Sequence, residues 1–155
     1  MAMAAAGLAL SVFNSIQATV RNRVRLKILP KSAVPVAANA FRRSLNQYPP
    51  GAKFCIEVVN LSAFPVTIDE IGFTRRGTKE RAACPYPVLP DNSGWPRRLE
   101  AHESVSAYID ISTLKADIEK AYAVTQSGIT RYGKSGALKQ LQEVLKQNPD
   151  EHPPG

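Results

Sequence analysis

The chain has 155 residues, 44% of them hydrophobic, which is typical of one globular domain that needs neither a metal nor disulfides to stabilise its core. Twelve prolines argue against a largely helical fold. The net charge of +7 comes from the N-terminal third, because residues 1–56 contain eight basic residues and no acidic one. Such a segment fits nucleic acid, an anionic membrane or an acidic protein as a partner.

Residues 1–21 are predicted to form an amphipathic helix. Residues 1–20 carry no charged side chain, and their larger apolar residues fall on one side of a helical wheel. The helix fits packing on the domain, on a partner or on a membrane surface, but its polar residues make it a poor span. Because no basic residue precedes it, it is a poor signal peptide. We expect a cytoplasmic protein, held at the inner face of the membrane by the basic run from Arg21 if the helix inserts.

The first predicted strand covers residues 22–30, where apolar and basic residues alternate. Val24, Leu26 and Ile28 would face the core, which leaves a positive outer face. Pro30 is expected to end the strand.

A loop is predicted over residues 31–51, which contain three prolines. A possible binding surface for nucleic acid or an anionic membrane combines this loop with the first strand; its residues are Arg23, Arg25, Lys27, Arg42 and Arg43. A solvated insertion is the simpler interpretation of the loop, because a nucleic-acid groove would need several aromatic side chains at regular strand positions.

Two strands are predicted next, over residues 54–59 and 66–73, joined by the turn NLSAFP. Val66 and Ile68 share one phase of the second strand, whereas Ile71 and Phe73 are one step out of phase. A β-bulge at residues 69–70 would bring all four to one face.

The stretch from residue 78 to residue 119 is predicted to be strand, irregular segment, strand and short helix. A short strand lies within residues 78–83, a proline-rich irregular segment follows, and Trp95 is expected at the edge of the core. Residues 105–110 alternate as a strand, and Ser112 is expected to cap a helix through about residue 119.

Cys55 and Cys84 are the only cysteines, and they have no metal-ligand spacing with His102 or His152. The chain therefore predicts no metal and no cofactor. Strand alternation points Cys55 away from the core, and two independent thiols are favoured over a disulfide.

Residues 128–135, GITRYGKS, match the phosphate-loop pattern of nucleotide-binding proteins. In a phosphate loop, Gly128, Gly133, Lys134 and Ser135 would be the residues that bind the phosphates of the nucleotide. Its interior residues are strand formers, only twenty residues follow, and no strand–helix alternation precedes it. A β-hairpin therefore explains the string better, with Thr125 and Ile129 flanking a tight turn. An amphipathic helix is predicted over residues 136–147, with a disordered tail over 148–155.

Four segments together suggest a known fold: RLKIL, FCIEVVNLSAFPVTIDEIGF, RRLEAHESVSAYID and AYAVTQSGITRYGKS. Their order resembles an immunoglobulin-like β-sandwich found in uncharacterised bacterial and phage-associated proteins, over residues 23–135. The resemblance implies an all-β, immunoglobulin-like antiparallel β-sandwich of about seven strands over residues 22–147. It implies no activity.

The expected function is that of a non-catalytic binding or scaffolding module with a protein partner. No catalytic residue is predicted, because His102 has no arrangement of nucleophile and base around it in the sequence. Nucleotide binding through GITRYGKS is one alternative. Binding of nucleic acid or an anionic membrane through the basic N-terminal third is the other.

Overall fold

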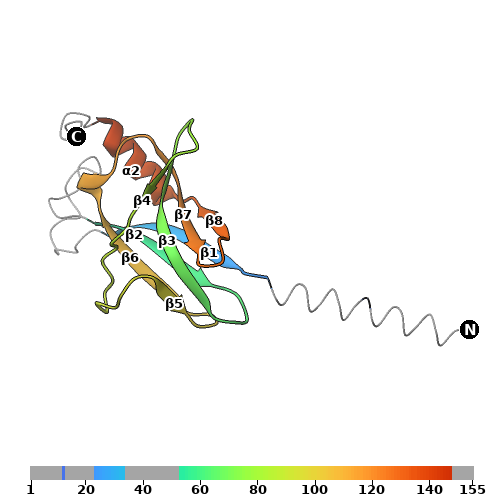
Figure 1. Cartoon of the computed structure of the whole chain (residues 1–155). Helices are drawn as coiled ribbons and strands as arrows, with labels where there is room; N and C mark the ends of the chain where they lie inside the picture. The colour runs from blue at the N-terminus through green and yellow to red at the C-terminus, as the bar shows by residue number, and fades with distance from the viewer. Residues whose placement is uncertain (1–11, 13–22, 34–52, 148–155) are drawn as a thin grey trace, which may run out of the picture.

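The structure is a computed structural model that describes Val12 and residues 23–33 and 53–147 (Figure 1). The predicted N-terminal helix over residues 1–21, apart from Val12, lies outside these residues. So do Arg42, Arg43 and the tail over residues 148–155.

Two antiparallel sheets make up most of the described chain. Sheet A has the strand order β1 (Leu26–Ala33), β2 (Lys53–Asn60), β6 (Ser104–Asp110). Sheet B has the order β4 (Arg81–Ala83), β3 (Val66–Arg75), β7 (Ile118–Thr125), β8 (Thr130–Gly133), and β5 (Arg97–Leu99) also pairs with β3. A 3-10 helix, η2 (Ile111–Thr113), and an α-helix, α2 (Gly136–Gln147), complete the described elements. The described residues thus form eight strands, and one of them, β5, lies in the segment that was predicted to be irregular.

The core lies between the two sheets and follows the alternation of their strands. Ile56 in β2 and Ile68 in β3 are fully buried in one cluster. The rings of Phe54 and Phe73, one from each sheet, lie 6.0 Å apart between centroids. Alternation places one face of β1, β2, β3 and β6 in this layer, so burial of apolar area holds the sheets together.

The predicted β-bulge in β3 is confirmed. The pairing of β3 with β7 shifts register between Ile68 and Glu70, which brings Ile71 to the core face. Trp95 packs against the edge of the core, as expected, and its indole N–H donates to the carbonyl of Asp69 at 2.8 Å. The indole therefore binds a backbone carbonyl within the bulge.

The prediction that Pro30 ends the first strand is wrong. β1 begins at Leu26 and continues to Ala33, with Pro30 buried opposite Ile56 of β2. Since β1 is the edge strand of sheet A, a proline costs no hydrogen bond where its missing N–H would point away from β2.

The helix predicted from Ser112 to about residue 119 is also wrong. The chain forms only η2, and the cap is Asp110, whose side chain accepts a hydrogen bond from the backbone N–H of Ser112 at 2.9 Å. β7 already begins at Ile118, whose side chain is buried in the core. Burial of the β7 side chains outweighs the weak local helix signal.

Both cysteines are free, which confirms the prediction of independent thiols. Cys55 lies outside the main core cluster, as alternation predicts, but it is only 4% exposed. Burial raises the pKa of its thiol, so the sulfur stays protonated at neutral pH.

The C-terminal helix forms over the predicted residues. Leu138 and Leu141 are buried, and α2 packs on β1 and β7 (Figure 1). The side-chain amide of Gln142 donates to the carbonyls of Ile118 at 2.9 Å and Glu119 at 3.2 Å, which ties the helix to the start of β7. Within the described ranges, no helix has the length and apolar character that crossing a membrane requires.

Candidate binding groove between strands β1 and β8

The string GITRYGKS contributes a tight hairpin and the start of α2. β7 and β8 pair antiparallel, and the N–H of Thr125 donates to the carbonyl of Ile129 at 3.0 Å. The turn closes with a bond from the N–H of Gly128, at a φ of 82°, to the carbonyl of Thr125 at 2.8 Å. The hairpin prediction is confirmed, because the chain forms a tight turn at Gly128 and continues as strand β8, which pairs with β7.

The remaining residues of the string have structural partners. An added Cβ on Gly133 would lie 2.0 Å from the carbonyl oxygen of Ile28, so a glycine is needed where β8 meets β1. Lys134 lies 3.6 Å from a carboxylate oxygen of Glu119. The hydroxyl of Ser135 donates to the carbonyl of Pro30 at 2.7 Å and accepts from the N–H of Leu138 at 3.1 Å. These packing and capping roles account for all three residue types.

β8 runs beside β1 in the same direction, although the two strands belong to different sheets (Figure 1). Arg131 donates to the carbonyl of Val24 at 3.3 Å near one end, and Ser135 meets Pro30 at the other. Between them Gly133 touches Ile28. The seam is therefore closed from Gly133 onward and wider near Arg131.

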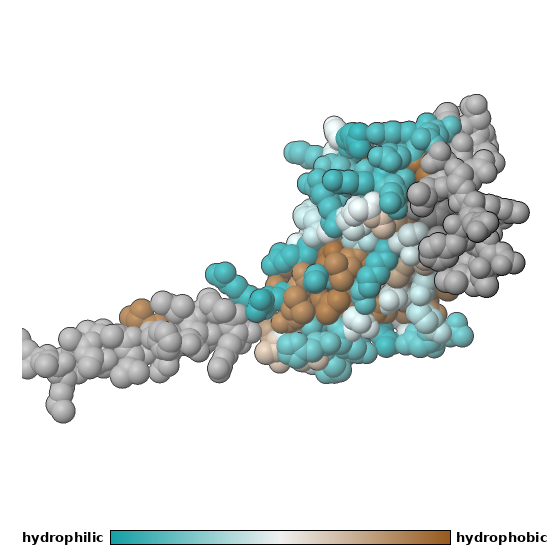
Figure 2. Space-filling view, turned by 180° about the vertical axis from the view of Figure 1, so that it is seen from behind, coloured by the Kyte–Doolittle hydropathy of each residue, from teal (hydrophilic) through white to brown (hydrophobic). Residues whose placement is uncertain are grey.

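At the wider end the seam forms an open groove of about 720 Å³, which we call the β1–β8 groove. Its lining consists of Arg23, Val24, Arg25, Leu26, Lys27, Ile28, Leu29, Leu61, Arg131, Tyr132, Gly133 and Lys134. Among these described residues five are basic and none is acidic. On the face shown in Figure 2, hydrophobic residues gather with hydrophilic ones around them.

Four of the five cations have no ion pair with another described residue. Among these, Arg131 donates to the backbone carbonyls of Thr130 and Val24, and the other three are Arg23, Arg25 and Lys27. All three side chains are exposed. By contrast, Lys31 farther along β1 pairs with Glu57, and Lys134 lies near Glu119. Unpaired positive charge therefore concentrates where the groove is widest, and exposed like charges there attract a counter-charge.

The backbone of the basic segment is held by the turn after β2. The N–H of Arg25 donates to the hydroxyl of Ser62 at 2.9 Å, and the N–H of Leu61 donates to the carbonyl of Arg25 at 2.7 Å. The N–H of Ser62 in turn donates to the side-chain oxygen of Asn60 at 2.9 Å. Asn60 thus holds Ser62 in place, and the hydroxyl of Ser62 in turn holds the backbone of Arg25.

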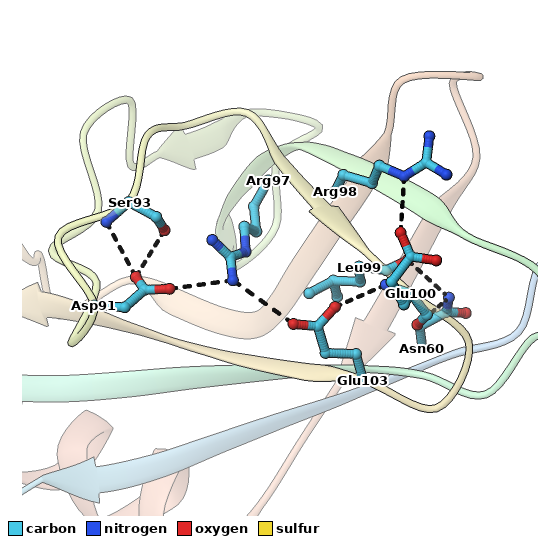
Figure 3. A network of polar contacts seen from close by, with 8 residues as sticks. All are labelled: Asn60, Asp91, Ser93, Arg97, Arg98, Leu99, Glu100 and Glu103. Carbon is cyan, nitrogen blue, oxygen red and sulfur yellow. Dashed lines mark hydrogen bonds and ion pairs between the residues drawn. The ribbon is translucent and has the colours of Figure 1, made fainter.

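Asn60 is fully buried, and every polar atom of its side chain has a hydrogen-bond partner; Figure 3 shows two of these partners, Leu99 and Glu100. Its Nδ2 donates to the carbonyls of Phe64 at 2.9 Å, Leu99 at 3.3 Å and Glu100 at 3.0 Å. We call these residues and Ser62 the Asn60 network. It joins the end of β2, the NLSAFP turn and the end of β5, which lie up to 40 positions apart in the sequence.

A set of charged side chains surrounds this network (Figure 3). The guanidinium of Arg97 lies 3.1 Å from Asp91 and 3.6 Å from Glu103, and Glu103 also accepts from the N–H of Glu100 at 2.8 Å. Hydrogen bonds from Ser93, helped by the charge of Arg97, lower the pKa of Asp91. These charges pair with one another, whereas Arg23, Arg25 and Lys27 have no ion pair within the part of the chain that the structure describes.

Of the residues predicted to form a binding surface, Arg23, Arg25 and Lys27 line the groove. Sequence reasoning did not assign Arg131 to it, because only the pairing of distant strands brings β8 beside β1. It also missed Asn60, although one signal was present: Asn60 continues the buried phase of Phe54, Ile56 and Val58 where another apolar residue is expected.

Within the residues that the structure describes, no group of three or more His, Cys, Asp or Glu side chains could hold a metal ion. Comparison of the chain with protein-family models, with curated proteins and with solved structures finds no match.

Proposed function

We propose that this domain is a non-catalytic binding module that holds an acidic segment of a protein partner in the β1–β8 groove. The observation that carries the proposal is the lining of the groove, with five basic and no acidic side chains among the described residues. Three of these cations have no side-chain partner among the described residues, so a bound carboxylate would not have to displace one there. Complementary charge of this kind gives fast association and selects against basic partners.

An immunoglobulin-like topology for the sandwich is part of this proposal. The order β1-β2-β6 facing β4-β3-β7-β8 corresponds to the strands A-B-E and C′-C-F-G of that fold. In this correspondence the groove lies where the first and last strands of the domain meet. Domains of this architecture serve many unrelated functions, so the proposed function rests on the groove and not on the fold.

A protein partner agrees with the groove better than nucleic acid or a membrane does. Among the described residues that line the groove, Tyr132 is the one aromatic, whereas single-stranded nucleic acid is bound by several stacked aromatic side chains. The groove is also concave, and the apolar residues lie between its cations. Binding to a membrane surface instead requires apolar side chains that protrude from the protein.

Charge reversal in the groove tests the proposal. The variant R23E/R25E/K27E reverses three unpaired cations, and K79E/K115E/K146E is its matched control, with three exposed lysines outside the groove lining. Both are compared with the wild-type chain by quantitative cross-linking in cells that make the protein. A protein partner found this way is then purified and titrated.

We expect a partner with an acidic segment that is lost from the groove variant, kept by the control, and bound more weakly as salt rises. If the groove variant keeps all the partners of the wild-type chain, the groove is not the binding surface and the proposal is wrong.

A further inference from the structure

We infer that the β1–β8 groove takes a short extended peptide in which acidic and apolar residues alternate, and that this peptide adds as a strand to the free edge of β1. The inference rests on the proposed function and names the chemistry and conformation of the partner segment. It follows from the backbone direction of β1, from the spacing of its cations and from the point at which β8 closes the groove.

The first observation is that part of the edge of β1 faces the groove. Among the described strands β1 pairs only with β2. The carbonyls of Ile28 and Pro30 point away from β2, since the first lies against Gly133 and the second accepts from Ser135. Backbone groups alternate in direction along a strand, so Leu26 directs its N–H and C=O the same way, into the groove. Because Ile28 and Pro30 are already occupied, Leu26 supplies the free edge groups of β1, and free edge groups are what an added strand binds.

The second observation concerns the two faces that an added strand would meet. Arg25 and Lys27 are two residues apart, as are Arg23 and Arg25, which corresponds to about 6.8 Å along extended chain. An extended peptide beside them repeats at the same interval. Carboxylates at every second residue can therefore meet these cations one by one, whereas a compact cluster of acidic residues cannot.

Apolar side chains occupy the opposite face at the same interval. Val24 and Leu26 are half-buried against the core, and both line the groove. The residues of the peptide between its carboxylates would point to this side. An apolar side chain there buries surface, and a charged one would lose its water without gaining a partner.

The third observation limits the length of the bound segment. The contact between Gly133 and Ile28 closes the seam, so an added strand cannot extend past Ile28 toward α2. On the open side Arg131 already donates to the carbonyl of Val24. The free part of this edge therefore lies between Val24 and Ile28, which leaves room for about three peptide residues at the rise of a strand.

The test uses two labelled hexapeptides of one composition, alternating Val-Glu-Val-Glu-Val-Glu and blocked Glu-Glu-Glu-Val-Val-Val, with fluorescence anisotropy of the full chain at low salt. The variant R25Q/K27Q removes the charges, and R25K/K27R keeps them. A series of alternating peptides, each N-methylated at one backbone amide, removes one N–H donor at a time. A hexathymidine oligonucleotide and phosphatidylserine vesicles are titrated in parallel.

We expect the alternating peptide to bind at least tenfold more tightly than the blocked one, and R25Q/K27Q to weaken its binding at least tenfold while R25K/K27R keeps it. N-methylation should weaken binding at least fivefold at the amide that donates to the carbonyl of Leu26 and little at the two amides beside it, because only alternate N–H groups face β1.

If the two peptides bind equally and lose affinity equally in R25Q/K27Q, or if N-methylation acts alike at all positions, strand addition is wrong while an acidic partner in the groove stands. Tighter charge-dependent binding of the oligonucleotide or the vesicles would overturn both the inference and the proposed function.

Discussion

The Asn60 network and the β1–β8 groove are joined through Ser62 and Arg25, yet they use polar groups in opposite ways. In the network every polar atom of a buried side chain has a partner, and the partners come from two segments, the NLSAFP turn and the end of β5. In the groove three neighbouring cations have none among the described residues. Satisfied buried polar groups stabilise one arrangement of the chain, whereas unpaired exposed charge adds nothing to stability and leaves charge available for binding.

The largest expected effect follows from the loss of the Asn60 side chain. Asn60→Ala should lower the free energy of unfolding by about 3 kcal/mol, because the N–H of Ser62 and the carbonyl of Leu99 each lose a hydrogen-bond partner in a buried site. Urea denaturation followed by circular dichroism measures this change. A loss below about 1 kcal/mol would show that water or neighbouring groups replace the amide, and that the network is not decisive for stability.

The closed end of the groove is tested by Gly133→Ala. The new Cβ would lie 2.0 Å from the backbone oxygen of Ile28, so β1 and β8 must separate, and we expect a loss of about 2 kcal/mol. Gly136→Ala is the matched control, because open space surrounds that position and its effect should stay within about 0.5 kcal/mol. Equal unfolding free energies for the two variants in urea would contradict the close approach of the strands.

A smaller, pH-dependent effect is expected at the charged residues around the network. The pKa of Asp91 is lowered in the folded protein, so its contribution to stability is present above the unfolded pKa and disappears as the pH falls through the folded one. Asp91→Asn should therefore be less stable than the wild type at neutral pH and equally stable in acid. Thermal melts at several pH values measure the difference, and a gap that persists at the lowest pH would exclude the carboxylate as its source.

The smallest effect on stability is expected in the groove itself. R23E/R25E/K27E should unfold within about 0.5 kcal/mol of the wild type, since these side chains are exposed and have no ion pair with a described residue. The same variant should lose partner binding. Coincident urea curves with lost binding would complete the contrast with Asn60→Ala, whereas a large loss of stability would mean that these cations have a structural role.

Much of the fold could be predicted because it depends on local alternation. The bulge in β3 was visible as a change of phase between Ile68 and Ile71, and the hairpin around Gly128 as strand formers on both sides of a glycine turn. Predictions were wrong where a tertiary contact outweighs a local signal. Pro30 is tolerated because β1 is an edge strand, and the segment after Asp110 becomes strand β7 because Ile118 is buried in the core.

Half of the candidate site could be predicted in the same way. Arg23, Arg25 and Lys27 are close in sequence, and their alternation with apolar residues was enough to place them on one positive face. The partners that turn this face into a groove are Arg131 and Tyr132, more than a hundred positions later. No local pattern relates the two segments, because their contact depends on which strands form the edges of the two sheets.

The amino-acid sequence by itself determined which residues alternate, where the turns form and where the excess positive charge lies, since each depends on neighbours a few positions away. Only the tertiary structure decided that β1 and β8 lie side by side, that Gly133 closes their seam and that Asn60 holds Arg25 in place. These features depend on backbone groups and charges brought together across the chain, and packing of the two sheets determines which of them find a partner and which face solvent.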